Sequence, residues 1–305
     1  PTIAFVLAAV VTWVSIFPVT RVAKRWKIMD VPGHRSSHEV PVPRIGGTGI
    51  IIGVIAASLI ICRFTKSLAV AVALGSVVAI VSFLDDIFTL SSSLRLAVHL
   101  FGAGLLIYLV GLEIPAIGLP YVQHAEPLPK IAGLVIATLF VVGFLNFFNF
   151  MDGINGISSS QGIIGGITLS ILFAMQSSSN CVAIAASIAG ACLGFLPHNF
   201  PKAKTFMGDV GSTALGFSLA MLTIVGGART DIPWVAFLLP FSLYIYDGAF
   251  TLTKRIIRRE NFMKPHREHH YQLLIRSGWS HVTVTGVYTL QFLACSVLAI
   301  LYAYT

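Results

Sequence analysis

Long apolar runs without charge are the feature of this sequence that most restricts how it can fold. The run from Ser67 to Leu84 contains no charged residue, and it is long enough to cross a bilayer as an α-helix. Similar runs recur along the 305 residues, without the alternation of apolar and polar residues that membrane barrels show. We therefore predict an all-α polytopic membrane protein with about ten transmembrane helices in one integral-membrane domain, residues 1–305. The expected spans are 2–20, 46–62, 67–84, 94–110, 131–147, 157–175, 181–197, 211–228, 234–253 and 284–304.

The composition agrees with a chain whose surface mostly faces lipid. Charged residues make up 10% of the sequence, against about 25% in a typical soluble domain, and the mean hydropathy is +0.86. No basic stretch precedes the first span, so we expect a retained helix and no cleaved secretory signal. The cysteines have no Cys-x-x-Cys spacing and are typical of small buried hydrophobic residues; they are Cys62, Cys181, Cys192 and Cys295.

The basic residues predict the orientation of the chain in its membrane. Sixteen of the 20 Lys and Arg residues lie on one side, in loops 21–45, 85–95, 198–210 and 254–283. The positive-inside rule places these loops in the cytoplasm and both termini outside. The net charge of +8 then follows from the topology, and nothing in the sequence indicates a nucleic-acid partner.

Polar clusters stand at the cytoplasmic ends of four expected spans. Asp85 and Asp86 close the run that begins at Ser67, and ionised groups beside hydrocarbon are costly and tend to mark function. The other clusters lie within residues 146–156, 206–212 and 265–272. Because successive spans alternate in direction, all four clusters face the same side. We therefore predict an active site built from cytoplasmic loops.

The cluster after the fifth span carries amide and carboxylate groups at a helix end. Asn146 and Asn149 are three residues apart, so a helix places them on one face, and Gly153 and Gly156 then end or kink that helix. Amide and carboxylate oxygens suit Mg²⁺ or the edge of a nucleobase. A polar helix C-cap is the alternative, although two amides, the Asp152 carboxylate and two glycines exceed what a cap needs.

Asp209 stands between two glycines where the eighth span begins. A helix N-cap is one interpretation, because Asp is favoured at that position. Gly208 and Gly211 also allow a phosphate to come close, and the paired glycines Gly46 and Gly47 offer a ligand the same access to backbone in the first inner loop. A carboxylate beside an anionic substrate needs a bridging cation, so the sequence predicts a metal here.

The last inner loop contains a histidine cluster. If this segment is helical, His266, His269 and His270 share one face. A zinc site and a structural histidine cluster are alternatives, although no cysteine accompanies the histidines. We favour contact with phosphates, with Arg267 as a bidentate donor.

Asp247 lies one to two helical turns before a basic run. We expect it to pair with Lys254 or Arg255 across those turns. The basic run itself, residues 254–259, favours a membrane-surface anchor to anionic lipid.

Taken together, these motifs resemble one family. The Asp85-Asp86 pair, the Asn-x-x-Asn-x-x-Asp-Gly-x-Asn-Gly segment, Phe-x-Gly-Asp-x-Gly-Ser at 206–212 and the His-x-x-His-His segment are similar to those of polyprenyl-phosphate N-acetylhexosamine-1-phosphate transferases, glycosyltransferase family 4. The resemblance covers essentially the whole chain, and residues 266–272 look like the branch that starts O-antigen or other surface-glycan synthesis. It implies transfer of a sugar 1-phosphate from a UDP-N-acetylhexosamine to undecaprenyl phosphate, with release of UMP.

The resemblance also implies roles for individual residues. Asp85 and Asp86 would orient or deprotonate the lipid phosphate, and Asp209 would complete the catalytic set. Asn149 and Asp209 would hold Mg²⁺, which Mn²⁺ can replace. The nucleotide site would comprise Asn146, Asp152, Gly153, Asn155 and Phe206. The phosphates would be contacted by Arg95, His266, Arg267, His269 and His270.

Two alternatives to this assignment remain open. One is the peptidoglycan enzyme of the same family, phospho-N-acetylmuramoyl-pentapeptide transferase, which usually has contiguous histidines. The other is an ion-coupled transporter, which would place charges near the midplane of several spans.

The sequence departs from the family pattern at two positions. Asn155 stands where many bacterial members have Asp, and Ile45 interrupts the glycines after Arg44, so the identity of the sugar is left open. The resemblance further implies a bacterial inner (plasma) membrane, contact with membrane lipids and, as an option, a homodimer.

The charge asymmetry predicts which loops are reachable from outside the cell. In a cysteine-free background, His124→Cys should react with a membrane-impermeant maleimide added to intact cells, and Glu268→Cys should not. The opposite labelling pattern would overturn the topology and the side of the active site together.

Overall fold

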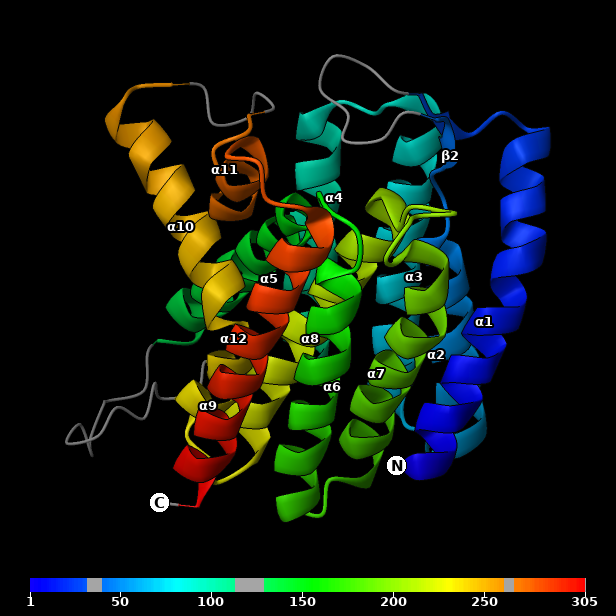
Figure 1. The fold of residues 1–305 in the computed structure, drawn as a ribbon. Coiled ribbons are helices and arrows are strands. Elements are labelled where there is room, and N and C mark those ends of the chain that lie inside the picture. The colour runs from blue at the N-terminus through cyan, green and yellow to red at the C-terminus, as the bar shows by residue number, and fades with distance from the viewer. Residues whose placement is uncertain (32–39, 113–128, 261–265, 305) are drawn as a thin grey trace.

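The protein is a bundle of helices with very little strand (Figure 1). We describe a computed structural model, which covers residues 1–31, 40–112, 129–260 and 266–304. Its only sheet in those residues is an antiparallel pair, β1 (Met29–Asp30) and β2 (Val42–Pro43). The helices are α1 (Thr2–Arg25), α2 (Gly47–Ile61), α3 (Lys66–Phe88), α4 (Ser92–Val110), α5 (Lys130–Met151), α6 (Ile157–Met175), α7 (Ser179–Asn199), α8 (Gly208–Arg229), α9 (Trp234–Leu238), η1 (Leu239–Phe241), α10 (Ser242–Ile257), α11 (His270–Arg276) and α12 (His281–Ala303).

The predicted spans match the observed helices closely. In the described residues, nine apolar helical segments are long enough to cross a membrane, with 234–257 counted as one, and α2 adds a shorter apolar helix of 15 residues. The prediction of an all-α polytopic membrane protein is therefore confirmed. The span expected at 234–253 is not one regular helix. It divides into α9, η1 and α10 around Pro240, which has no backbone N–H to continue the helix.

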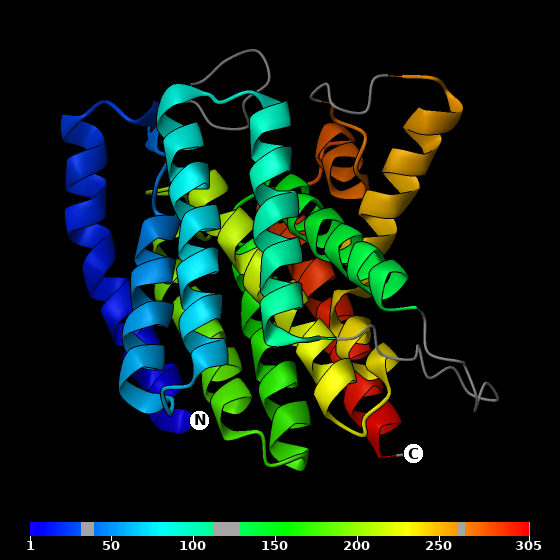
Figure 2. The same ribbon diagram turned by 180° about the vertical axis from the view of Figure 1, so that it is seen from behind.

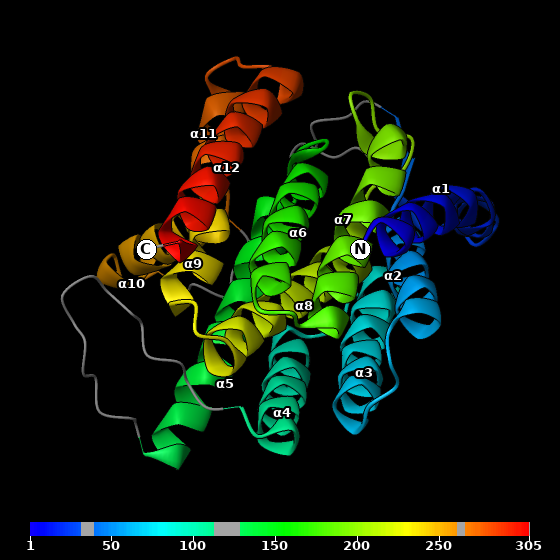
Figure 3. The same ribbon diagram turned by 90° about the horizontal axis from the view of Figure 1, so that it is seen from below.

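Helix α8 forms the centre of the bundle (Figure 3). It packs against α2, α3, α5, α6, α7 and α9. In the most apolar 18-residue stretch of α8, 78% of the residues are buried inside the protein, whereas in that of α3 only 17% are buried. Helix α8 is therefore enclosed by protein, and α3 leaves most of its surface for lipid. Polar side chains at the start of α8 can therefore meet loops from several neighbouring helices.

The connecting segments gather at the two ends of the bundle (Figures 1 and 2). The N- and C-termini lie at one end, and the turn between α3 and α4 lies at the other, together with α11. The long helices thus bring polar residues that are far apart in sequence to a single end of the molecule.

Two paired glycines let α2 approach α8 at backbone distance. The amide of Gly46 donates to the carbonyl of Phe206 at 2.9 Å, and the amide of Gly47 donates to the carbonyl of Met207 at 2.8 Å. A Cβ atom on Gly47 would collide with the backbone of Gly211. The sequence suggested that these glycines admit a ligand, but in the structure they admit another segment of the chain.

The short sheet ties the first loop to the residues that precede α8. Met29 pairs with Pro43 in the β1–β2 register. The carbonyl of Pro43 then accepts hydrogen bonds from the Phe206 amide at 2.8 Å and from the Thr205 hydroxyl at 2.9 Å. These contacts hold Arg44, the next residue along the chain, beside the start of α8.

We predict that Gly47→Ala destabilises the protein. The added methyl group must push α2 away from α8, and such overpacking costs about 1–3 kcal/mol, which lowers Tm by a few degrees. The control is Gly286→Ala in α12, where an added Cβ would meet nothing within 4 Å. Thermal unfolding of both variants in the same detergent gives the comparison, and an unchanged Tm for Gly47→Ala would contradict the packing described here.

Candidate active site

The C-terminal end of α3 presents two buried carboxylates. Asp85 and Asp86 are each only 5% exposed. Asp85 Oδ1 accepts a hydrogen bond from the Leu90 amide at 2.6 Å, and Thr89 closes the helix in the left-handed conformation with a φ of 50°. Asp85 therefore stabilises the tight turn that leads into α4. The same hydrogen bond fixes the direction of the second carboxylate oxygen of Asp85.

Asp86 binds the N-terminus of α8. It accepts from the amide of Asp209 at 3.1 Å and from the amide of Val210 at 2.9 Å, where the unpaired N–H groups of a helix start favour an anion. The Nε atom of Arg44 lies 3.1 Å from the same carboxylate. A Cβ on Gly208, which has a φ of +69°, would lie 2.7 Å from Asp86 Oδ2. Glycine is required there for Asp86 to reach the helix.

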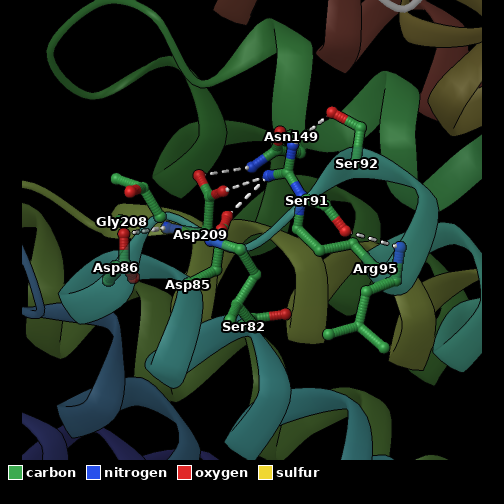
Figure 4. Close-up of polar contacts among 12 residues, drawn as sticks. Ser82, Asp85, Asp86, Ser91, Ser92, Arg95, Asn149, Gly208 and Asp209 are labelled. Carbon is green, nitrogen blue, oxygen red and sulfur yellow. Dashed lines mark hydrogen bonds and ion pairs between the residues drawn. The ribbon is translucent and has the colours of Figure 1, made fainter.

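Arg95 joins two of the carboxylates (Figure 4). Its Nη1 atom lies 2.6 Å from Asp85 Oδ2 and 3.0 Å from Asp209 Oδ2. Asp209 is in the first turn of α8, whereas the N-cap position belongs to Met207. The N-cap interpretation of Asp209 was therefore wrong, and its side chain points toward Arg95 (Figure 4).

Asn149 completes this network from the end of α5. Its Nδ2 atom donates to Asp209 Oδ1 at 3.1 Å and to the Ser212 hydroxyl at 2.8 Å. We refer to Asp85, Arg95, Asn149 and Asp209 as the carboxylate network. Ser212 was given no role from the sequence. The available signal was its position three residues after Asp209, which places both on one face of α8.

An open pocket of about 280 Å³ lies beside the carboxylate network. Of the residues predicted to form the site, Asn149, Asp152, Gly153, Asn155, Phe206 and Asp209 line it. Four polar or charged residues to which the sequence gave no role also line it, namely Asp30, Arg44, Asn199 and Ser212. The structure thus brings two of the predicted clusters, one after α5 and one before α8, to the same cavity.

The loop after α5 is held in place by Asn199. The Oδ1 atom of Asn199 accepts from the Gly156 amide at 2.7 Å, and its Nδ2 atom donates to the Thr205 carbonyl at 3.0 Å. Asn155 donates from Nδ2 to the Pro201 carbonyl at 3.0 Å. The two loops that line the pocket are therefore fastened to each other.

The surroundings of Asp152 raise the pKa of its carboxyl. Burial raises the pKa of its carboxyl to about 8, helped by the negative charges of Asp209 and Asp86 and opposed by a hydrogen bond with Ser158. The carboxyl is therefore mostly protonated at neutral pH. It can donate a hydrogen bond into the pocket without adding a negative charge there.

Asn146 and the histidine segment do not line this pocket. Asn146 donates to the carbonyl of Val142 in its own helix at 2.7 Å. The histidines do not share one helical face, because the condition for it is not met: α11 begins at His270, and His269 is its N-cap. His266 and His269 still lie together, with ring centroids 5.0 Å apart, next to Phe150 at the end of α5.

Two further facts define the chemistry of this segment. Burial lowers the pKa of His266, with the nearby His269 and Arg255 acting in the same direction, so its ring is neutral at neutral pH. The Arg267 side chain is exposed. The segment adjoins the pocket through Tyr271, whose hydroxyl donates to the Phe150 carbonyl at 2.8 Å.

Asp247 anchors the histidine segment to α10, which corrects the pairing expected from the sequence. It accepts from the His270 amide at 3.0 Å, and the Nδ1 atoms of His269 and His270 lie 3.1 and 3.3 Å from its Oδ1 atom. Lys254 and Arg255 pair instead with Glu268. Asp247 is 2% exposed, so these contacts compensate for burying its charge.

The donor atoms of the carboxylate network suit a hard cation. Among the described residues, no three His, Cys, Asp or Glu side chains are grouped as a metal site made by protein alone requires. Mg²⁺ usually binds one or two protein carboxylates and completes its shell with water and substrate phosphates. The Asp209 carboxylate fits that kind of site, and the Ser212 hydroxyl is joined to it through Asn149. In the structure Asn149 turns its Nδ2 atom toward both groups, so it would bind the ion only with its amide turned to present the oxygen.

The structure is thus an integral-membrane helical bundle in which carboxylates, amides and guanidinium groups meet beside a pocket at one end. Residues 68–227 match the model of glycosyl transferase family 4. The protein belongs to this family, as its motifs indicated.

Its relatives carry related names. A Bacillus subtilis (strain 168) protein named "Probable undecaprenyl-phosphate N-acetylglucosaminyl 1-phosphate transferase" is 28% identical over 95% of this chain and 83% of its own length. A Mycobacterium tuberculosis (strain ATCC 25618 / H37Rv) decaprenyl-phosphate N-acetylglucosaminephosphotransferase is 27% identical over 90% of this chain and 75% of its own length. A phospho-N-acetylmuramoyl-pentapeptide-transferase from Streptococcus pyogenes serotype M3 (strain MGAS315, ATCC BAA-595) is 31% identical, over 72% of this chain and 71% of its own length.

We predict that Asp247→Ala loosens α11 without unfolding the bundle. The substitution leaves the buried His270 amide and the His269 ring without their acceptor, a loss of about 1–3 kcal/mol. Hydrogen exchange measured by mass spectrometry should quicken in peptides covering 269–276 and stay unchanged in α8. Asp231→Ala, which removes an exposed carboxylate at the opposite end, is the control. Equal protection of 269–276 in both variants would show that Asp247 does not hold the segment.

Proposed function

We propose that the protein transfers an N-acetylhexosamine 1-phosphate from a UDP-sugar to undecaprenyl phosphate. UMP leaves, and the sugar remains linked to the lipid through a pyrophosphate. The observation that carries this proposal is the carboxylate network beside an open pocket, where Arg95 and Asp209 meet within 3.0 Å. The names of the relatives that cover most of this chain support it.

The reaction gathers several phosphate charges in a small volume, so electrostatic stabilisation has to dominate catalysis. Positive charge is supplied by Arg44, which pairs with Asp86, and by Arg95, which pairs with Asp209. Asp209 and Asn149 would hold Mg²⁺ against the pyrophosphate of the donor. When bound, that ion neutralises charge that develops on the phosphoryl oxygens.

Asp85 and Asp86 act mainly by positioning in this proposal. The oxygens of Asp86 already accept two amides of α8 and face Arg44, and Asp85 is engaged by Leu90 and Arg95. A phosphate monoester has a second pKa near ~6 and is mostly dianionic at neutral pH. The lipid phosphate therefore attacks directly, with Arg95 orienting it, and no residue has to form a covalent intermediate.

In this proposal the uridine nucleotide of the donor binds to the residues that line the pocket. The protonated Asp152 carboxyl, with its pKa of about 8, donates a hydrogen bond to a uracil carbonyl beside Gly153 and Asn155. Phe206 provides a stacking surface. Arg267 and the histidine segment contact phosphate or sugar from the Phe150 side of the pocket.

The charge pattern supports the orientation of the protein in its membrane, and the family resemblance supports its cellular location and its product. The active site faces the cytoplasm, because the predicted loops on its side of the membrane hold 16 of the 20 basic residues in the sequence. The membrane is the inner membrane of a bacterium, as the resemblance implies. The product starts O-antigen or a related surface polysaccharide.

The peptidoglycan transferase is the second candidate, because the Streptococcus pyogenes relative with that name is 31% identical. A substrate panel separates the two. Purified protein with undecaprenyl phosphate should release UMP from UDP-N-acetylglucosamine or a related UDP-N-acetylhexosamine, and not from UDP-N-acetylmuramoyl pentapeptide. Turnover of the pentapeptide donor alone would reverse the assignment.

We predict that Asp209→Asn abolishes turnover while the protein still folds. Removing one key electrostatic group should reduce kcat by at least about 10²-fold. EDTA should silence the wild type, and Mg²⁺ or Mn²⁺ should restore it. Mn²⁺ binding followed by electron paramagnetic resonance should weaken in Asp209→Asn but not in the Asp231→Asn control. Activity that ignores EDTA, or normal Mn²⁺ binding by Asp209→Asn, would remove Asp209 from the metal site.

A further inference from the structure

A second cavity occupies the half of the bundle opposite the active site. It is an apolar groove of about 440 Å³ between α2, α3, α4, α7 and α8, and it shares no residue with the active-site pocket. Helices α3 and α4 lie side by side on this face of the molecule (Figure 2). Its walls include Val54, Ala71, Gly75, Phe217 and Leu222.

The groove is long enough to hold one lipid chain. Along α8 it extends from Ala214 to Arg229, a rise of roughly 22 Å at about 1.5 Å per residue. This is longer than the about 15 Å that one leaflet contributes to a bilayer's hydrocarbon thickness, so an acyl chain can lie in it over the full depth of its leaflet. Small residues on α3, among them Ala71 and Ser76, leave the space that a chain would fill.

Three cations surround the end of the groove that lies farthest from the active site. Arg229 lines the groove and donates to the carbonyls of Val110 and Gly111 at 3.1 and 3.2 Å. Lys66 lies between the lining residues Thr65 and Ser67.

Arg63 is the third cation. Its backbone amide donates to the side chain of Asn180, another lining residue, at 3.0 Å, and this contact places Arg63 beside the groove. All three side chains are exposed. In the described part of this end of the molecule, Asp231 is the only carboxylate.

We propose that this groove binds one acyl chain of an anionic phospholipid, with the lipid phosphate at Arg63, Lys66 and Arg229. An apolar slot that ends in clustered cations matches an amphiphile with a negative headgroup. The reaction's own lipid does not fit this orientation, since its phosphate must reach Arg95 at the other end of the bundle. A symmetric dimer through the groove would bring two copies of the same cations together.

Photo-crosslinking tests this proposal on the full chain in phosphatidylcholine nanodiscs. The probe is phosphatidylglycerol with a diazirine at the end of one acyl chain, compared with phosphatidylcholine that carries the same group. Adducts of the anionic probe should concentrate in residues 68–79 and 214–225. Ala71→Trp, which fills the groove, should reduce them several-fold, whereas Ala73→Trp on the exposed face of the same helix should not.

The charge requirement is tested separately. Replacing Arg63, Lys66 and Arg229 together with Gln should lower the preference for the anionic probe by roughly tenfold or more, and Lys130→Gln, which lies outside the groove, should leave it unchanged. Three results would overturn the proposal: adducts spread evenly over the lipid-facing helices, equal labelling of the groove by both probes, or crosslinks between two copies of the chain through the groove. Sugar transfer is not the readout, so failure here leaves the proposed reaction untouched.

Discussion

The contact between Asp86 and the first turn of α8 is the interaction on which the active site depends. Two amides of α8 donate to a carboxylate at the end of α3, across 123 residues of sequence. An anion at a helix N-terminus contributes up to about 2 kcal/mol in partly buried geometries. Its larger effect is geometric. By fixing where α8 begins, Asp86 fixes Asp209, and only then do Arg95 and Asn149 meet on that side chain.

Close backbone packing makes this contact attainable. The amides of Gly46 and Gly47 bond to the carbonyls just before α8, and Gly211 leaves room for that approach. Arg44 follows the short sheet and reaches Asp86 from the other side. The site is therefore assembled from α3, α4, α5 and α8 around a buried central helix, and the pocket opens where the loops before α6 and α8 are tied by Asn199.

Local patterns predicted most of the fold, and they pointed to several side chains that the structure brings together. Uncharged runs marked the helices because only a helix satisfies its own backbone in lipid, and Asp85, Asn149 and Asp209 were found because polar groups stood where such runs end. The partners could not be predicted. Asp247 was assigned to the cations one or two turns away, yet it binds His269 and His270, since tertiary contacts override helix spacing. Nor could the sequence alone decide whether the histidines share a helix, and in the structure His269 caps α11 and does not enter it.

We propose that the carboxylate network moves a sugar together with its phosphate onto a lipid phosphate. The most direct measurement uses UDP-N-acetylglucosamine labelled both at the β-phosphorus and in the sugar, with purified protein, Mg²⁺ and undecaprenyl phosphate. We expect both labels in the lipid product in equal amounts, UMP as the only released nucleotide, and no label on the protein when the lipid is omitted. Sugar label in the lipid without phosphorus label, or labelled protein formed without lipid, would contradict the account.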